Sequence, residues 1–181
     1  MIEQYTEVIG RPAMPPYWGL GFHLCRYNYG SLNRTREIWA RTRQAKIPFD
    51  VQWNDIDYMD RNDDFTYDHR SFAGLPEFVD EVHAVGMHYV PIIDPGISQS
   101  EVGYGPYDQG LDMKVFVRQS ADSDAPFVGK VWNTVSTVWP DFTHPNATEY
   151  WTQQLRLFHN QVRRFCCPLW ATSNGAIDRD Q

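Results

Sequence analysis

The sequence lacks the features that membrane proteins, secreted precursors and nucleic-acid-binding proteins share. A membrane-spanning helix needs about 18 or more consecutive apolar residues, and no run here approaches that length. The first thirty residues do not show a basic segment followed by an apolar one, so no signal peptide is visible. Lys and Arg number 16 against 23 Asp and Glu, for a formal charge of −7, and no basic block is present. These absences exclude a membrane span and argue against nucleic acid as a partner.

Cysteine is also scarce. Cys25 stands alone, and Cys166 and Cys167 are adjacent, a spacing that suits neither a disulfide framework nor a CxxC metal site. The redox compartment of the protein therefore stays undecided.

Aromatic residues are what the sequence has in excess. The chain holds 7 Trp, 10 Tyr and 10 Phe, which together make 15% of its residues. Aromatic faces beside carboxylates suit the binding of sugars, although filling a hydrophobic core is the ordinary use of such side chains. Composition alone leaves both interpretations open.

Hydrophobic periodicity predicts alternating strands and helices. We expect strands over residues 17–22, 49–55 and 88–94, and helices over 34–46, 75–85 and 146–162. Residues 95–141 are expected to be irregular, with a small strand pair near 114–118 and 128–132. The strand starts are 32 and 39 residues apart, close to the length of one unit of a (β/α)8 barrel. The expected fold is α/β, a partial TIM barrel of about three β/α units with a long insertion after the third strand.

Two long segments and several shorter ones carry a family resemblance. Residues 14–26 (MPPYWGLGFHLCR) and 50–60 (DVQWNDIDYMD), then 93–98 (IDPGIS) and 139–143 (WPDFT), are similar to the first part of the catalytic barrel in glycoside hydrolase family 31, in its α-glucosidase branch. The resemblance covers about residues 3 to 162. It implies an N-terminal barrel portion over 1–162, hydrolysis of terminal α-1,4-linked glucose in oligosaccharides or glycogen, and no cofactor, because such hydrolysis runs on carboxylates.

The resemblance also implies roles for five positions. Asp55 corresponds to a carboxylate that binds hydroxyls of the sugar to be cleaved, and the other four line the same pocket: Tyr27, Trp53, Ile92 and Trp132. Independently of the family, Trp53 and Asp55 share one face of the expected strand, and Asp55 lies at its C-terminal end, where (β/α) barrels place their active sites.

The catalytic pair of the family is not found in the sequence. A retaining glycosidase needs two carboxyl groups about 5 to 5.5 Å apart, and the family's nucleophile motif, Trp-Ile-Asp-Met-Asn-Glu, does not occur. Where that strand is expected, residues 163–168 read RRFCCP, and we expect 163–181 to be a divergent, disordered tail. Asp178 lacks a strand context and is not assigned. We therefore assign no catalytic residue and expect a fragment or truncated form that does not hydrolyse its substrate alone.

Two other function classes remain open. One is a non-catalytic sugar-binding or regulatory product, and the other is an interaction module that uses the open edge of an incomplete sheet. That open edge also predicts marginal stability.

Several polar residues have ordinary alternatives. The acidic residues between 55 and 64 could form a solvated loop or a cation site, but the EF-hand spacing fails and no metal is expected. His83 and His88 are expected to be surface or capping residues. Asn33 and Asn146 begin N-glycosylation sequons and could equally be helix caps. The family is lysosomal or secreted, but without a visible signal peptide the location of this product is undetermined.

Overall fold

A three-stranded parallel sheet forms one part of the molecule. The computed structural model describes residues 1–11, 13–99 and 103–162. The strands are β1 (His23–Leu24), β2 (Val51–Asn54) and β3 (His88–Pro91), in the order β1-β2-β3. In the parallel register, Val51 is paired with both His23 and His88. The three C-terminal strand ends therefore lie at the same edge of the sheet.

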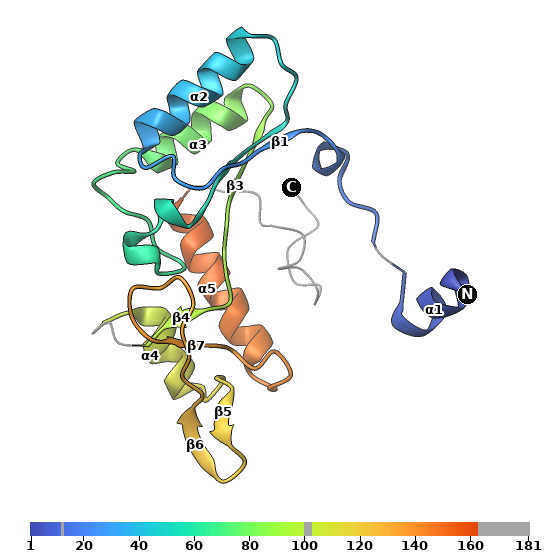
Figure 1. Ribbon diagram of the computed structural model, residues 1–181, viewed down its shortest axis with the longest axis vertical. Coiled ribbons are helices and arrows are strands. Elements are labelled where there is room, and N and C mark those ends of the chain that lie inside the picture. The colour runs from blue at the N-terminus through green and yellow to red at the C-terminus, as the bar shows by residue number, and fades with distance from the viewer. Residues whose placement is uncertain (12, 100–102, 163–181) are drawn as a thin grey trace.

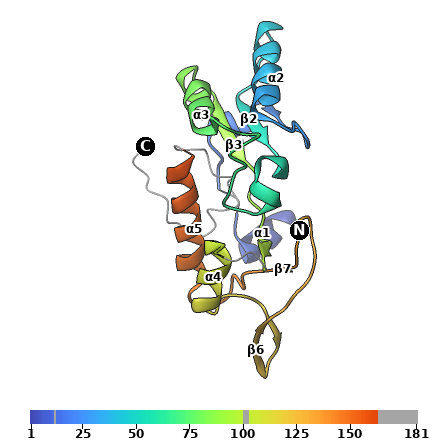
Figure 2. The ribbon, with the colours of Figure 1, turned by 90° about the vertical axis from the view of Figure 1, so that its left-hand side faces the viewer.

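Two helices connect these strands and cover one face of the sheet. Helix α2 (Leu32–Gln44) begins at Ser31, whose side chain accepts a hydrogen bond from the backbone N–H of Arg34 (3.2 Å). Helix α3 (Leu75–Ala84) ends before Gly86, which adopts φ 75°. Figures 1 and 2 show α2 and α3 side by side, where Trp39 packs edge-on against Phe78. The predicted helices are thus confirmed to within two residues at each end.

The first predicted strand is wrong over its whole length, because no residue from 17 to 22 lies in a strand. Residues Tyr17–Leu20 form a 3-10 helix, and β1 begins only at His23. Pro16 has φ −60°, and its carbonyl accepts from the N–H of Gly19 (2.9 Å), which starts the turn. Aromatic and apolar composition favoured a strand, but two consecutive prolines and the tight turn after them override that preference.

Polar side chains fill the helix-facing side of β2. Gln52 and Asn54 are both fully buried, and Asn54 donates from Nδ2 to Thr35 Oγ1 on α2 (2.9 Å). The hydroxyl of Tyr89, also fully buried, donates to Asn54 Oδ1 (3.1 Å). This network links one helix and two strands, so it fixes how α2 sits on the sheet.

A second group of elements follows β3. It contains α5 (Ala147–Gln161), which was predicted, and four strands in two antiparallel pairs: β4 (Ile97–Ser98) with β7 (Thr137–Val138), and β5 (Arg118–Ser120) with β6 (Ser123–Pro126). The second of these pairs replaces the strand pair expected at 114–118 and 128–132, and it is shifted in position along the chain. In Figure 1 the β5–β6 hairpin extends away from the rest of the fold.

Helix α4 (Gly105–Asp112) lies in the region expected to be irregular. Its two glycines and one proline read as a loop in the sequence, but Pro106 occupies the first turn, where a missing N–H costs nothing. The Tyr150 hydroxyl of α5 donates to the Pro106 carbonyl (2.8 Å), so tertiary contact stabilises a segment of weak intrinsic helicity.

Other short elements complete the described chain. They are α1 (Ile2–Ile9), which has no buried residue and stands apart in Figure 1, and the 3-10 helices η2 (Ile56–Tyr58) and η3 (Asp60–Asn62). The described residues thus form a mixed α/β fold with three parallel strands and no closed barrel. The expected tail, residues 163–181, lies outside them.

Candidate functional site

The candidate site lies at the C-terminal ends of β2 and β3. Asp55 directly follows β2, and Ile92 and Asp94 follow β3. The parallel ladder continues one step past the strands, because Ile92 N–H donates to the Asn54 carbonyl (3.0 Å). This pairing brings residues that are 37 to 39 positions apart in the sequence to one edge of the sheet.

Asp94 makes a long-range side-chain contact at this edge. Its Oδ2 accepts a hydrogen bond from the indole N–H of Trp132 (2.7 Å), although the two residues are 38 positions apart. Burial raises the pKa of Asp94, the Trp132 bond opposes that rise, and the charge of Asp55 adds to it. The electrostatic coupling shows that Asp55, Asp94 and Trp132 gather in one place.

Asp94 was not among the residues predicted from the sequence. Residues 93–98 entered the family resemblance without a role for the carboxylate of Asp94. The available signal was its position after a buried strand, the same signal that supported Asp55.

Asp55 is partly buried, and one of its oxygens caps a turn. Oδ1 accepts from the backbone N–H of Ile56 (2.7 Å), which orients the carboxylate at the start of η2. Its charge also reaches Cys25 at the end of β1, where burial, Asp55 and Asp57 raise the pKa of the thiol. All three strand ends therefore contribute to this edge.

Tyr27 lies in the loop after β1 and is 62% exposed. Asp57 holds that loop, because its two carboxylate oxygens accept from the backbone N–H groups of Asn28 (3.1 Å) and Gly30 (2.8 Å). The structure places Tyr27 at the correct edge of the sheet. Its role in a sugar pocket stays a prediction.

Trp53 makes its polar contact toward β1. Its indole N–H donates to His23 Nδ1 (2.9 Å), and the other ring nitrogen of His23 lies 3.2 Å from the Gly19 carbonyl. Both bonds form when the His23 proton is on Nε2. From His23 the aromatic contacts continue to Trp18, which stacks on His88 with ring centroids 4.2 Å apart. Trp53 thus anchors the sheet, and its predicted sugar contact is untested.

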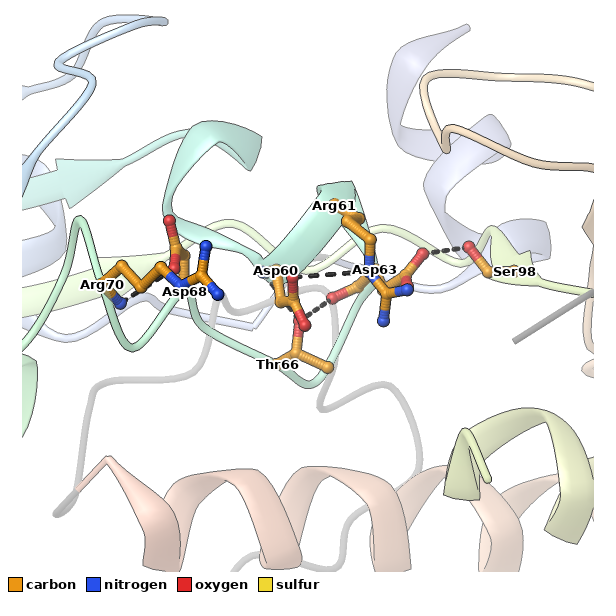
Figure 3. A network of polar contacts seen from close by, with 7 residues as sticks. All are labelled: Asp60, Arg61, Asp63, Thr66, Asp68, Arg70 and Ser98. Carbon is orange, nitrogen blue, oxygen red and sulfur yellow. Dashed lines mark hydrogen bonds and ion pairs between the residues drawn. The ribbon is translucent and has the colours of Figure 1, made fainter. Parts of the chain in front are cut away.

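Two further acidic residues are buried behind the site. Asp63 and Asp64 are 1% and 2% exposed, so the solvated-loop interpretation of the acidic run is wrong for both. Asp63 accepts a hydrogen bond from Ser98, as Figure 3 shows, and the carboxylate of Asp64 accepts from the backbone N–H of Asp94 (2.6 Å). Burial raises the pKa of Asp64 well above the usual carboxyl range. These contacts hold the chain at Asp94 in place.

The structure changes the interpretation of the two histidines and of one of the two sequon asparagines. His83 and His88 are partly buried, with ring centroids 6.4 Å apart, and burial lowers the pKa of each, so neither is a simple surface residue. Asn33 lies inside α2, where Ser31 is the cap, so the capping alternative is wrong there. Asn146 occupies the cap position of α5 without a capping side-chain bond. Both asparagines are exposed, and their glycosylation is untested.

The described part of the chain offers neither a metal-binding cluster nor a membrane-spanning helix. Between residues 1 and 162, leaving out 12 and 100–102, no three His, Cys, Asp or Glu side chains are grouped to hold a metal ion. Over the same residues no helix combines the length and the apolar character needed to cross a membrane.

Comparison with known sequences points to one family. The model of the glycosyl hydrolases family 31 TIM-barrel domain matches residues 12–174. The chain is 47% identical to intestinal sucrase-isomaltase of Suncus murinus over 167 residues, and 45% identical to lysosomal alpha-glucosidase of Rattus norvegicus over 164 residues. Each match covers 90% of this chain but only 9% and 17% of the two relatives. The chain therefore corresponds to a small part of each relative.

Solved structures give the same result. A family 31 alpha-glucosidase from Bacteroides thetaiotaomicron superimposes with a TM-score of 0.78 at 31% identity, over 92% of this chain and 27% of that protein. A Glc1Man2-bound glucosidase II alpha subunit gives a TM-score of 0.79 at 29% identity, over 92% and 18%. The described fold is thus a fold that family 31 enzymes contain.

Proposed function

The chain belongs to glycosyl hydrolase family 31, and on that premise we propose that it provides the sugar-binding part of an α-glucosidase barrel. The observation that carries this proposal is the Asp94–Trp132 hydrogen bond beside Asp55, at the C-terminal ends of parallel strands. Carboxylates accept hydrogen bonds from sugar hydroxyls, and an indole face packs on the apolar side of a glucose ring. The substrate is the terminal α-linked glucose of an oligosaccharide.

Five residues from the sequence prediction and one from the structure form the proposed subsite. Asp55 and Asp94 bind hydroxyl groups, and the remaining four line the subsite: Tyr27, Trp53, Ile92 and Trp132. The exposed fraction of Trp132, 58%, supports its use as a wall that a ligand covers. Ile92 is partly buried, and its carbonyl accepts from the Tyr58 hydroxyl (2.8 Å), which keeps the strand end in position.

We propose further that the chain binds but does not hydrolyse α-glucosides by itself. Cleavage with retention needs a nucleophile and an acid/base carboxyl group about 5 to 5.5 Å apart. The family's nucleophile motif is missing from the sequence, and the carboxylates of Asp55 and Asp64 each accept a hydrogen bond from a backbone N–H. Catalysis would then require residues that this chain does not supply.

The test combines binding and turnover in the full chain. Maltose binding is measured by calorimetry, and hydrolysis is measured with a chromogenic α-glucoside. Asp55→Asn should weaken maltose binding at least about tenfold, because a charged hydrogen bond contributes about 1.5–3 kcal/mol. Asp112→Asn, at an exposed acid at the end of α4, is the matched control and should leave the affinity unchanged. Equal affinity in wild type and Asp55→Asn would contradict the subsite, and turnover that Asp55→Asn abolishes would contradict the missing catalytic pair.

The sheet favours a second candidate function. Among the described residues, β1 and β3 each pair with β2 alone, so each has one edge without a strand partner. We propose that the three β/α units are a part of a (β/α)8 barrel and that these edges pair with further strands. Size-exclusion chromatography with light scattering tests this. A defined dimer, or a stable complex with a complementary barrel fragment, supports the proposal. A chain that stays monomeric at all concentrations and does not bind the fragment contradicts it.

A further inference from the structure

Trp132 lies near the tip of a loop that is closed at its base. The backbone groups of Gly129 and Thr137 bond each other in both directions, at 2.9 and 3.0 Å. Inside the loop the Lys130 ammonium donates to the carbonyls of Asn133 (2.6 Å) and Val135 (2.9 Å). These bonds set the shape of the loop. They do not set where its tip lies relative to the strand ends.

Two asparagines join this tip to the segment after β2. Asn62 donates from Nδ2 to the Trp132 carbonyl (3.2 Å), and Asn133 donates from Nδ2 to the Asn62 carbonyl (3.0 Å). The two side chains thus bond in opposite directions across about 70 residues of sequence. Because one bond ends on Trp132 itself, the pair acts directly on the tip.

Asn133 is the buried member of the pair, with 2% of its surface exposed. Its Oδ1 accepts from the Thr137 hydroxyl (3.0 Å), and its Nδ2 also lies 3.5 Å from the Gly96 carbonyl. The amide therefore has partners on the loop, on η3 and at the start of β4. A buried amide with contacts to three segments fixes their mutual positions.

Asn62 adopts a left-handed backbone conformation. Its φ is 61°, and the preceding Arg61 has φ 54°. Such conformations are uncommon for residues with a Cβ and are tolerated best by asparagine and aspartate. In this conformation both the carbonyl and the side-chain amide of Asn62 reach the 129–137 loop.

We propose that Asn62 and Asn133 are positioning residues that hold Trp132 against Asp94. They keep the tip of the 129–137 loop in the position where the indole N–H of Trp132 donates to Asp94 Oδ2 and the exposed indole ring can contact a ligand. The consequence for sugar binding rests on the proposed function. The effect on the Trp132–Asp94 bond does not depend on it.

The direct readout is hydrogen exchange of the Trp132 indole N–H in the full chain, measured by NMR on protein with ¹⁵N-labelled tryptophan. The signal that Trp132→Phe removes identifies the proton. Asn62→Gly deletes the donor but keeps the backbone conformation, since glycine adopts positive φ freely. Exchange should become about two- to tenfold faster, the effect of losing one neutral hydrogen bond. Maltose affinity should fall by a similar factor.

Lys46→Gly is the matched control. Lys46 also has a positive φ, 56°, but it lies after α2, away from the 129–137 loop, and this substitution should leave both readouts unchanged. Asn62→Asp is a second variant that keeps the shape of the side chain and its backbone preference while losing the donor. If Asn62→Gly does not fold, Asn62→Asp tests the positioning role of Asn62.

The outcomes separate the two proposals. Unchanged indole exchange in both Asn62 variants overturns the positioning role, whether or not the chain binds maltose. If exchange accelerates but wild type shows no maltose binding, the positioning role stands and the proposed function fails. Faster exchange with weaker maltose binding supports both.

Discussion

Asn54→Ala should destabilise the fold strongly, although it removes no apolar contact. Asn54 is fully buried and joins Thr35 of α2 to Tyr89 of β3 through its side-chain amide. Alanine provides neither the donor nor the acceptor. The substitution therefore tests whether the polar network between helix and sheet contributes to stability.

The expected loss of folding free energy depends on which hydrogen bonds Thr35 and Tyr89 keep after the substitution. Thr35 keeps its bond to the Ser31 carbonyl (3.2 Å), so it loses one hydrogen bond, worth about 0.5–1.5 kcal/mol. Among the described residues, Tyr89 has no other hydrogen-bond partner for its buried hydroxyl, and stranding such a group costs about 1–3 kcal/mol. The total is about 2–4 kcal/mol, before any cavity term.

Urea unfolding followed by tryptophan fluorescence measures this cost. With a slope of about 2 kcal/mol per molar urea, the midpoint should fall by about 1–2 M. Adding Tyr89→Phe to Asn54→Ala removes the stranded hydroxyl and should recover about 1–2 kcal/mol in a double-mutant cycle. A double variant no more stable than Asn54→Ala, or a single variant that costs less than about 1 kcal/mol, would refute the reasoning.

Two further substitutions have clear expected outcomes. Asp64→Asn should raise the free energy of unfolding at pH 7, because the folded-state pKa of Asp64 lies above its unfolded value and wild type loses stability as the pH rises between the two. The gain is about 1.4 kcal/mol for each pKa unit of that difference, and it should vanish as the pH falls toward about 4. Urea midpoints of both proteins at pH 7 and at about pH 4 measure it. Gly110→Ala should lower the free energy of unfolding by about 1–3 kcal/mol, because its Cβ would lie 2.6 Å from Phe116 Cε2. Gly105→Ala, at a position with open space, should be close to neutral. Thermal unfolding measures both variants, and equal midpoints would contradict this reasoning.

Local sequence predicted five of the helices and strands, namely α2, α3, α5, β2 and β3, and indicated five candidate site residues. The helical spacing at α2, α3 and α5, the alternation at β2 and the apolar run at β3 were readable because such patterns follow the period of each structure. The five candidate site residues came from the family resemblance: Tyr27, Trp53, Asp55, Ile92 and Trp132. The first strand and α4 were not predictable in this way, because proline and glycine content misleads unless the tertiary partner is known.

Tertiary structure alone decided which distant residues meet. Nothing in the sequence pairs Asp94 with Trp132, or Asn62 with Asn133, since each pair is separated by 38 to 71 positions and carries no periodic signal. A strand pattern fixes which side of a strand faces a core, but the partner of a polar side chain depends on how loops close over the strand ends. For this reason the sequence indicated the family and the edge of the candidate site, and the fold determined which side chains hold that edge together.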